Sequence, residues 1–376
     1  MSTLGPDART IVIAPDGFKG SITAADAAAA IAQGWASARP GDRIVLRPVA
    51  DGGEGTLDAF AAAVPGARRM PVTVTGPDGA PTDAAWLLLP ATADEPWGAG
   101  VVEVASTSGI ELLGERRVPW DADTTGFGEA IAAALDHGVT RLVLGIGSSA
   151  STDGGSGLLT VLGARFTDAA GEPVARGARG LGAVAEADLS GLRPLPPGGA
   201  VVLTDVTNPL LGRRGAAAVF GPQKGLDARD VASAEEGLAR LAALLPADPF
   251  TPGAGAAGGA GFALLAWGAQ LVPGASEVAE LVGLPAALAG AAIVVTGEGS
   301  FDTQSASGKA PAHVAALAAG AGVRAALVAG RIAATSDVSG FAAAVSLTEL
   351  AGSTDAALAE PARWLRAAGA SLARRL

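Results

Sequence analysis

Short apolar runs that end in polar, glycine-rich loops recur along this chain, and this pattern constrains its fold more than any other feature. Residues 10–15 form a β-branched run that ends in Asp16-Gly17, a stretch with helical periodicity follows, and residues 43–49 form a second apolar run. Two strands separated by a helix are typical of a βαβ unit with a parallel sheet. Similar apolar runs lie at residues 141–144, 201–203, 291–295 and 325–328. We therefore expect an α/β fold.

Residues 72–104 show a different pattern, in which short β-branched runs are joined by turns such as Pro77-Asp78-Gly79. Runs of this kind favour antiparallel strands. Alternating strands and helices return after them. This switch predicts one α/β domain inserted in another, with residues 1–70 and 288–376 in the outer domain and residues 71–287 in the inserted one.

The composition excludes several classes of site. The 376 residues carry a formal net charge of −11, which argues against a basic nucleic-acid-binding face. Cysteine is absent, which excludes disulfides and thiolate chemistry, and two histidines are too few for a histidine metal cluster. Of only three lysines, Lys19 and Lys224 stand in glycine-flanked loops. Each of these two either neutralises a carboxylate or phosphate or is simply solvated.

The N-terminus lacks the apolar segment of a secretory signal, which is compatible with a cytoplasmic location. Residues 253–276 carry no charge and are long enough to cross a bilayer. Their first half is nearly all Gly and Ala, however, and Gln270 and Pro273 interrupt the rest. We therefore interpret this segment as a buried glycine loop that leads into a core helix.

The glycine loop after residues 141–144 is the most distinctive one. Gly145–Ala150 fits the dinucleotide-binding pattern G-x-G-x-x-A, with Asp168 about twenty residues later, so an NAD-binding loop is one interpretation and a plain turn is another. Ser151–Gly155 intervene before a helix can begin, which favours a loop of backbone amides and small hydroxyls that binds phosphate. The candidate phosphate-binding residues are Gly147, Ser148, Ser149, Ser151, Thr152 and Asp153.

A second glycine loop, Gly253–Gly258, either covers a phosphate or is a flexible loop beside a helix start. Its candidate binding residues are Gly255 and Gly258.

Acidic residues follow two of the predicted strands. Asp205 ends one apolar run, with Asn208 three positions later, and Glu298 and Asp302 follow another. Acids in such places can hold Mg²⁺ or accept the proton of an attacking hydroxyl. A helix cap or a solvated turn is the alternative for each of them.

Seven motifs follow one another along most of the chain: Asp16–Ser21, Ala50–Thr56, Gly145–Gly155, Thr204–Gly212, Val219–Gly225, Pro252–Gly259 and Thr296–Asp302. In this order they closely resemble the bacterial glycerate kinases of the glycerate kinase type-1 family, over about residues 11 to 350. One departure is Ser148, which stands where that family usually has a second glycine.

The resemblance implies ATP-dependent phosphorylation of D-glycerate, with 2-phosphoglycerate as the favoured product and Mg²⁺ as a cofactor. It also implies a Rossmann-like outer α/β domain that has a parallel sheet and is discontinuous in sequence. The inserted domain would be mixed α/β, and the active site would lie in the cleft. The expected partners are glycerate and ATP, with neither nucleic acid nor membrane, for a cytoplasmic monomer or homodimer. Two other functions stay open: an NAD-dependent hydroxy-acid dehydrogenase and an inactive, ligand-sensing homologue.

Within this resemblance we assign roles as hypotheses. ATP phosphates would bind the candidate residues of the two glycine loops. Glycerate would bind Gly52, Gly53, Glu54 and Lys224. The catalytic residues would be Lys19, Asp51 and Asp205, with Asp51 or Asp205 as the proton acceptor. Mg²⁺ would be held near Asp205, Asn208, Glu298 and Asp302.

Overall fold

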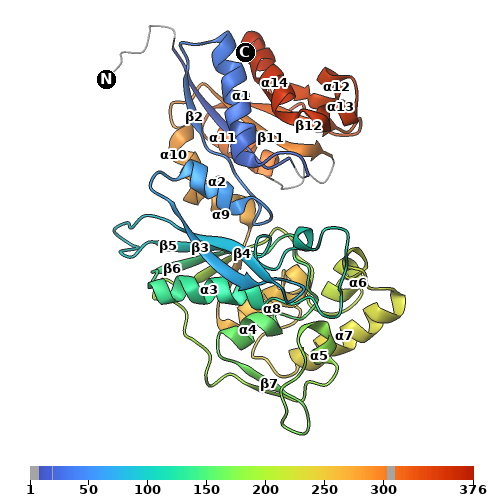
Figure 1. Cartoon of the computed structure of the whole chain (residues 1–376). Coiled ribbons are helices and arrows are strands. Elements are labelled where there is room, and N and C mark those ends of the chain that lie inside the picture. The colour runs from blue at the N-terminus through green and yellow to red at the C-terminus, as the bar shows by residue number, and fades with distance from the viewer. Residues whose placement is uncertain (1–7, 19, 303–309) are drawn as a thin grey trace. The chain divides into compact units, whose positions relative to one another are not determined.

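The computed structural model describes residues 8–18, 20–302 and 310–376 (Figure 1). Contacts within the chain divide it into two compact units. Unit 1 comprises the residues up to Asp51, Asp58–Pro65 and the residues from Ala275 onward, and unit 2 comprises Gly52–Leu57 and Gly66–Gly274. The chain therefore leaves unit 1 and later returns to it.

Unit 1 contains a five-stranded parallel sheet in the order β13-β12-β11-β1-β2. Its strands are β1 (Thr10–Pro15), β2 (Arg43–Leu46), β11 (Ile293–Phe301), β12 (Arg324–Ile332) and β13 (Ala343–Ser346). Its helices, of which α2 and α9 begin in unit 2, are α1 (Ala24–Ala38), α2 (Thr56–Ala63), α9 (Gly274–Leu281), α10 (Leu284–Leu288), α11 (Ala310–Gly320), α12 (Leu347–Ala351), α13 (Thr354–Ala359) and α14 (Pro361–Arg375). The predicted βαβ unit is confirmed, since β1 and β2 pair in parallel on either side of α1 in the sequence.

Glycine allows α1 and α14 to lie unusually close together. A Cβ on Gly34 would be 2.0 Å from the carbonyl oxygen of Arg366, and one on Gly369 would be 2.2 Å from the carbonyl oxygen of Ile31. The two helices pack on a fully buried core that includes Ile13 of β1. Because this core occupies a face of the sheet, the carboxyl ends of the strands stay available for a site.

Unit 2 contains a six-stranded mixed sheet in the order β10-β9-β6-β5-β4-β3. Its strands are β3 (Arg68–Thr75), β4 (Pro81–Leu88), β5 (Ala99–Glu103), β6 (Arg141–Gly145), β9 (Ala200–Leu203) and β10 (Gln270–Val272), and β7 (Arg165–Thr167) pairs separately with β8 (Glu186–Asp188). Its helices are α3 (Thr125–His137), α4 (Ser156–Val161), α5 (Gly177–Leu181), α6 (Ala216–Phe220), α7 (Ala228–Ala242) and α8 (Ala260–Trp267), with 3₁₀ turns at Ile110–Leu113, Pro222–Lys224 and Ala256–Gly259. The antiparallel pairing predicted from residue 72 onward is confirmed for β3, β4 and β5.

The predicted α/β class with parallel sheets is thus confirmed. The borders of the compact units differ somewhat from the predicted domain borders, since all of β3 belongs to unit 2 and α10 to unit 1. The division into an outer and an inserted domain stays a prediction.

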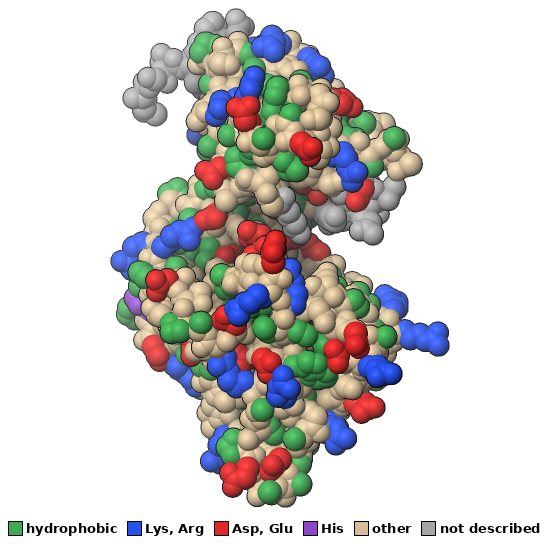
Figure 2. Space-filling view, turned by 45° about the vertical axis from the view of Figure 1, so that its right-hand side comes forward, with side chains coloured by type: hydrophobic (Ala, Val, Ile, Leu, Met, Phe, Trp, Pro, Cys, Tyr) green, Lys and Arg blue, Asp and Glu red, His purple; other side chains and the backbone are tan. Residues whose placement is uncertain are grey.

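The uncharged segment 253–276 is broken into the 3₁₀ turn, α8 and β10. Among the described residues, no helix combines the length and apolarity needed to cross a bilayer. On the face shown in Figure 2, Lys and Arg side chains are interspersed with Asp and Glu.

Candidate active site

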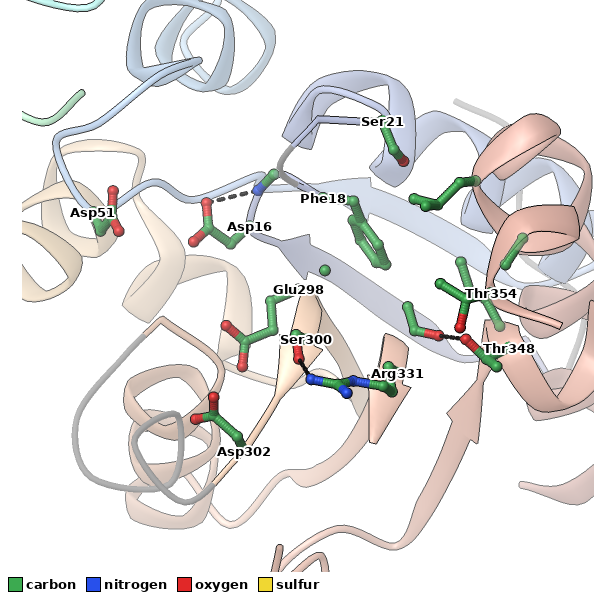
Figure 3. Close-up of a pocket in the computed structure, with 16 residues that line it drawn as sticks. Asp16, Phe18, Ser21, Asp51, Glu298, Ser300, Asp302, Arg331, Thr348 and Thr354 are labelled. Atoms are coloured by element: carbon green, nitrogen blue, oxygen red, sulfur yellow. Dashed lines mark hydrogen bonds between the residues drawn. The ribbon is translucent and has the colours of Figure 1, made fainter. Parts of the chain in front are cut away.

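A pocket of about 390 Å³ lies in unit 1, where the parallel strands end (Figure 3). Ligand sites of open α/β sheets typically lie outside the carboxyl ends of the strands. The residues that line it are Asp16, Gly17, Phe18, Ser21, Asp51, Glu298, Gly299, Ser300, Asp302, Gly330, Arg331, Leu347, Thr348, Thr354, Ala357 and Leu358. They come from the ends of β1, β11 and β12, from the segment after β2, and from α12 and α13.

Next to this pocket, two glycines allow β11 and β12 to lie very close together. A Cβ on Gly297 would be 2.1 Å from the carbonyl oxygen of Val328, and one on Gly330 would be 2.3 Å from the carbonyl oxygen of Gly299. The loop after β1 is bound to β11, since the Asp16 amide donates to the Gly297 carbonyl at 2.8 Å. The glycine-rich sequence after residue 295 therefore shapes the pocket through backbone contact.

One end of the pocket is acidic. It holds the carboxylates of Asp16, Asp51, Glu298 and Asp302 (Figure 3). The structure thus brings together three residues that the sequence analysis selected from two separate motifs, namely Asp51, Glu298 and Asp302. The fourth, Asp16, accepts a hydrogen bond from the Gly17 amide at 2.6 Å.

The other end of the pocket carries hydroxyls and aliphatic side chains from α12 and α13. The Thr348 hydroxyl donates to the Gly330 carbonyl at 2.9 Å. Between the two ends, the Arg331 guanidinium donates to the Ser300 hydroxyl at 3.3 Å (Figure 3). Sequence reasoning missed Arg331; the only signal available was its position beside a glycine at the end of an apolar run.

The metal hypothesis can be tested on the donor groups. In the described ranges, no group of three or more His, Asp or Glu side chains is arranged to hold a metal ion. Mg²⁺, however, is commonly bound by one or two carboxylates together with water and substrate phosphates. Glu298 and Asp302 project into the same part of the pocket and offer such oxygen donors (Figure 3). This pair fits Mg²⁺.

Asp205 and Asn208, the other metal candidates, belong to unit 2. The Asp205 carboxylate accepts a hydrogen bond from the Gly274 amide at 2.9 Å, at the start of α9. The Asn208 amide group donates to the Arg214 carbonyl at 2.8 Å. Both contacts match the helix-cap and turn alternatives considered for these residues. Lys19 lies outside the described residues.

In unit 2 the turn at Gly52-Gly53 lies directly on the turn after β6. The Gly147 amide donates to the Gly52 carbonyl at 2.9 Å, and a Cβ on Gly147 would be 2.5 Å from the Gly53 Cα. A Cβ on Gly145 would be 2.7 Å from the Gly52 carbonyl oxygen. The structure therefore joins the predicted glycerate motif and the predicted phosphate loop. Gly52 and Gly53 are buried in this contact, and Glu54 is exposed.

Most of the predicted phosphate loop lies in the interior of unit 2. Gly147 and Ser148 are half-buried, whereas Ser149–Gly155 are buried. The carboxylate of Asp153 is fully buried and accepts hydrogen bonds from the Thr124 amide (3.0 Å), the Thr124 hydroxyl (2.8 Å) and the Gly157 amide (3.2 Å). Burial, reinforced by the nearby Asp123 carboxylate, raises the pKa of Asp153. Asp153 thus connects the start of α3 to α4 rather than facing a ligand.

Lys224, assigned to the substrate, also lies inside unit 2. Its side chain is 2% exposed, and the ammonium donates to the Ser149 hydroxyl at 2.8 Å and to the Ser151 carbonyl at 2.5 Å. Burial lowers the pKa of Lys224 to about 7, against the opposing attraction of Asp153. In this position Lys224 contacts the loop from the interior of unit 2. The buried hydroxyls of Ser151 and Thr152 have no hydrogen-bond partner in the described part of the chain.

The second glycine loop is packed against the first. The Gly154 amide donates to the Gly258 carbonyl at 3.0 Å, and a Cβ on Gly258 would be 2.0 Å from the Ser151 carbonyl oxygen. The Gly255 amide donates to the Asn208 carbonyl at 2.9 Å. Gly255 and Gly258 are buried and allow the two loops to pack together.

Comparison with known proteins shows the family. A sequence model of the glycerate kinase family matches residues 11–376. Glycerate 2-kinase of Escherichia coli is 40% identical over 319 residues, covering 82% of this chain and 81% of its own, and glycerate kinase of Bacillus subtilis is 41% identical over the same shares. A crystal structure from Salmonella typhimurium LT2, provisionally described as glycerate kinase 2, superposes with a TM-score of 0.83 at 38% identity and covers 98% of both chains. The chain therefore belongs to the glycerate kinase family.

Proposed function

We propose that this protein transfers the terminal phosphoryl group of ATP to D-glycerate and produces 2-phosphoglycerate. The family membership supports the reaction, and the E. coli relative, named a glycerate 2-kinase, supports the product. The observation that carries the proposal is a pocket that gathers acids from separate motifs at the carboxyl ends of parallel strands. The order of the motifs favours the type-1 branch of the family. A cytoplasmic monomer or homodimer completes the proposal.

Phosphoryl transfer needs in-line positioning and neutralisation of charge more than covalent chemistry. Glu298 and Asp302 would hold Mg²⁺, which would neutralise negative charge on the transferred group. Asp51 would accept the proton of the glycerate hydroxyl, and its position in the same pocket supports this role. The turn from Gly52 to Glu54 and Lys19 would hold the acid substrate. Of the predicted phosphate loop, Gly147 and Ser148 would contact a ligand directly; their partial exposure supports this, since Ser149–Gly155 are buried.

The test is a coupled assay of ADP release with the purified full-length chain, ATP, Mg²⁺ and D-glycerate. Enolase added alone distinguishes the products, because it dehydrates 2-phosphoglycerate directly and leaves 3-phosphoglycerate unchanged. No ADP above background with glycerate and related hydroxy-acids contradicts the kinase proposal. NADH formation from NAD and glycerate would support the dehydrogenase, and ligand-induced thermal stabilisation without turnover would support the sensor.

Two carboxylates compete for the role of proton acceptor, and their variants separate them. Asp51→Asn should lower kcat at least about a hundredfold, the usual contribution of a general base. Asp205→Asn keeps an oxygen that can accept from the Gly274 amide, so its kcat should fall far less. The opposite ranking would transfer the role to Asp205.

A further inference from the structure

The unit 1 pocket has room for more than the acid substrate, and its two ends differ in chemistry. Its volume of about 390 Å³ lies in the range of pockets that enclose drug-sized ligands. A three-carbon acid would leave most of it empty. Carboxylates line one end, and the other end is formed by α12 and α13 (Figure 3). A ligand that fills it must therefore be long, with one apolar part and one highly charged part.

The end formed by α12 and α13 presents apolar surface to solvent. Leu358 is 53% exposed although it lines the pocket, and the nearby Leu347, Ala357 and Phe18 side chains are buried beneath the surface. Large exposed aliphatic side chains in a concave site are typical of ligand contacts. The Thr354 hydroxyl at this end has no hydrogen-bond partner within the described ranges, so it is available to a polar edge of the ligand. An aromatic heterocycle has this combination of apolar faces and polar edges.

The centre of the pocket holds a positive charge, the Arg331 guanidinium. Arg331 forms no ion pair with any described carboxylate, although four carboxylates line the same pocket, and its guanidinium donates a hydrogen bond to the Ser300 hydroxyl. Guanidinium groups bind phosphate through paired hydrogen bonds. The position of Arg331, between the apolar end and the acidic end, matches the order of base, phosphates and metal in a nucleotide bound with Mg²⁺ (Figure 3).

We propose that this pocket binds the nucleoside triphosphate donor, with its base at the Thr354–Leu358 end and its phosphates on Arg331 and Ser300. The inference rests on the proposed kinase function and assigns its nucleotide site to unit 1. This assignment differs from the hypothesis that the Gly145–Gly155 loop holds the phosphates. Most of that loop is buried inside unit 2, where its residues are not exposed to a ligand.

Equilibrium binding without turnover tests the site. Calorimetry with the full chain and Mg²⁺, in the absence of glycerate, would use three probes: a non-hydrolysable ATP analogue, tripolyphosphate and adenosine. Arg331→Gln should weaken the ATP analogue and tripolyphosphate about 10- to 100-fold, since a hydrogen-bonded charge is lost, and should leave adenosine unchanged. Arg324→Gln is the matched control, because Arg324 is an exposed arginine at the opposite end of the same strand.

The base end has its own variant. Thr354→Trp would place a large side chain in the part of the pocket lined by α12 and α13. It should weaken binding of the ATP analogue and of adenosine at least about tenfold and leave tripolyphosphate binding unchanged. Asp355→Trp is its control, on the same helix but outside the pocket lining. Melting curves would verify that each variant is folded. If Thr354→Trp does not fold, Arg331→Gln alone decides the proposal, because Arg331 is exposed and its replacement should leave the fold intact.

The outcomes separate this proposal from the proposed reaction. If Arg331→Gln binds the ATP analogue within twofold of the wild type and instead raises KM for glycerate, the pocket belongs to the acid substrate and the inference is wrong. If the binding pattern is as expected but glycerate is not phosphorylated, the nucleotide site stands and the proposed substrate is wrong.

Discussion

The buried ammonium of Lys224 should make the stability of this protein depend on pH in a specific direction. Burial lowers its pKa from the ordinary 10.5 to about 7 in the folded protein. The unfolded chain therefore binds this proton more tightly than the folded chain. The charged Lys224 therefore lowers the free energy of unfolding, and this destabilisation is fully present below pH 7 and disappears as the pH rises toward 10.5. Between these two pH values, Lys224 makes the free energy of unfolding rise with pH.

The size of the effect follows from the same shift. Each pKa unit corresponds to about 1.4 kcal/mol, so the complete contribution is about 5 kcal/mol. About 2 kcal/mol of it falls between pH 7 and pH 9, where the folded lysine has become largely neutral and the unfolded one has not. Lys224→Met removes the titrating group and keeps most of the side-chain volume.

Urea denaturation followed by circular dichroism at pH 7, 8 and 9 would measure the effect. The free energy of unfolding of the wild type, relative to Lys224→Met, should increase by about 2 kcal/mol over this range. Arg240→Met, which removes an exposed cation from α7, should follow the wild type at every pH. Parallel curves for the wild type and Lys224→Met would refute the reasoning, because they would mean that the folded lysine keeps its ordinary pKa.

Three further changes test other parts of the structure. Asp302→Asn removes one of two carboxylates suited to Mg²⁺, so the Mg²⁺ concentration for half-maximal rate should rise at least about tenfold; an unchanged requirement would exclude Asp302 as a ligand. Ser148 has a φ of 60°, a left-handed conformation that is strained for serine. Ser148→Gly should raise the free energy of unfolding by about 0.5–1 kcal/mol, because the relief of this strain exceeds the entropy that glycine loses on folding. A loss of stability in the same urea assay would contradict this. Gly147→Ala places a Cβ 2.5 Å from the Gly53 Cα and should cost about 1–3 kcal/mol of stability. It should also lower kcat/KM for glycerate more than kcat/KM for ATP. Equal losses for both substrates would oppose a role of this turn in binding the acid.

The fold class and the acidic end of the pocket could be predicted because both depend on local pattern. β-branched runs separated by a helical stretch favour a parallel sheet, and parallel strands bring their carboxyl ends to one edge. Asp51, Glu298 and Asp302 lie in one pocket for this reason. The opposite end could not be predicted, since Leu358 is an unremarkable leucine in the sequence and becomes a pocket wall only through the packing of α13.

Lys224 shows the same limit from the other side. A lysine between glycines suggests an exposed cation for an anionic substrate, and nothing within a few residues of it indicates burial. Its actual partners, Ser149 and Ser151, are more than seventy residues away in the sequence. Burial is set by such long-range contacts, so the charged residue that looked most available in unit 2 is among its least exposed.

The glycine loops carry the most general consequence, because one sequence signal has two physical causes. A position without Cβ lets a ligand approach the backbone, and it equally lets a second backbone segment approach. At Gly52, Gly145 and Gly147 the structure shows the second cause, since each Cβ would collide with a neighbouring turn or strand end of this chain. Such glycines fix where the neighbouring Glu54 and Ser148 lie. It follows that replacing them should disturb the whole group of loops, whereas replacing Arg331 should disturb one ligand and leave the fold intact.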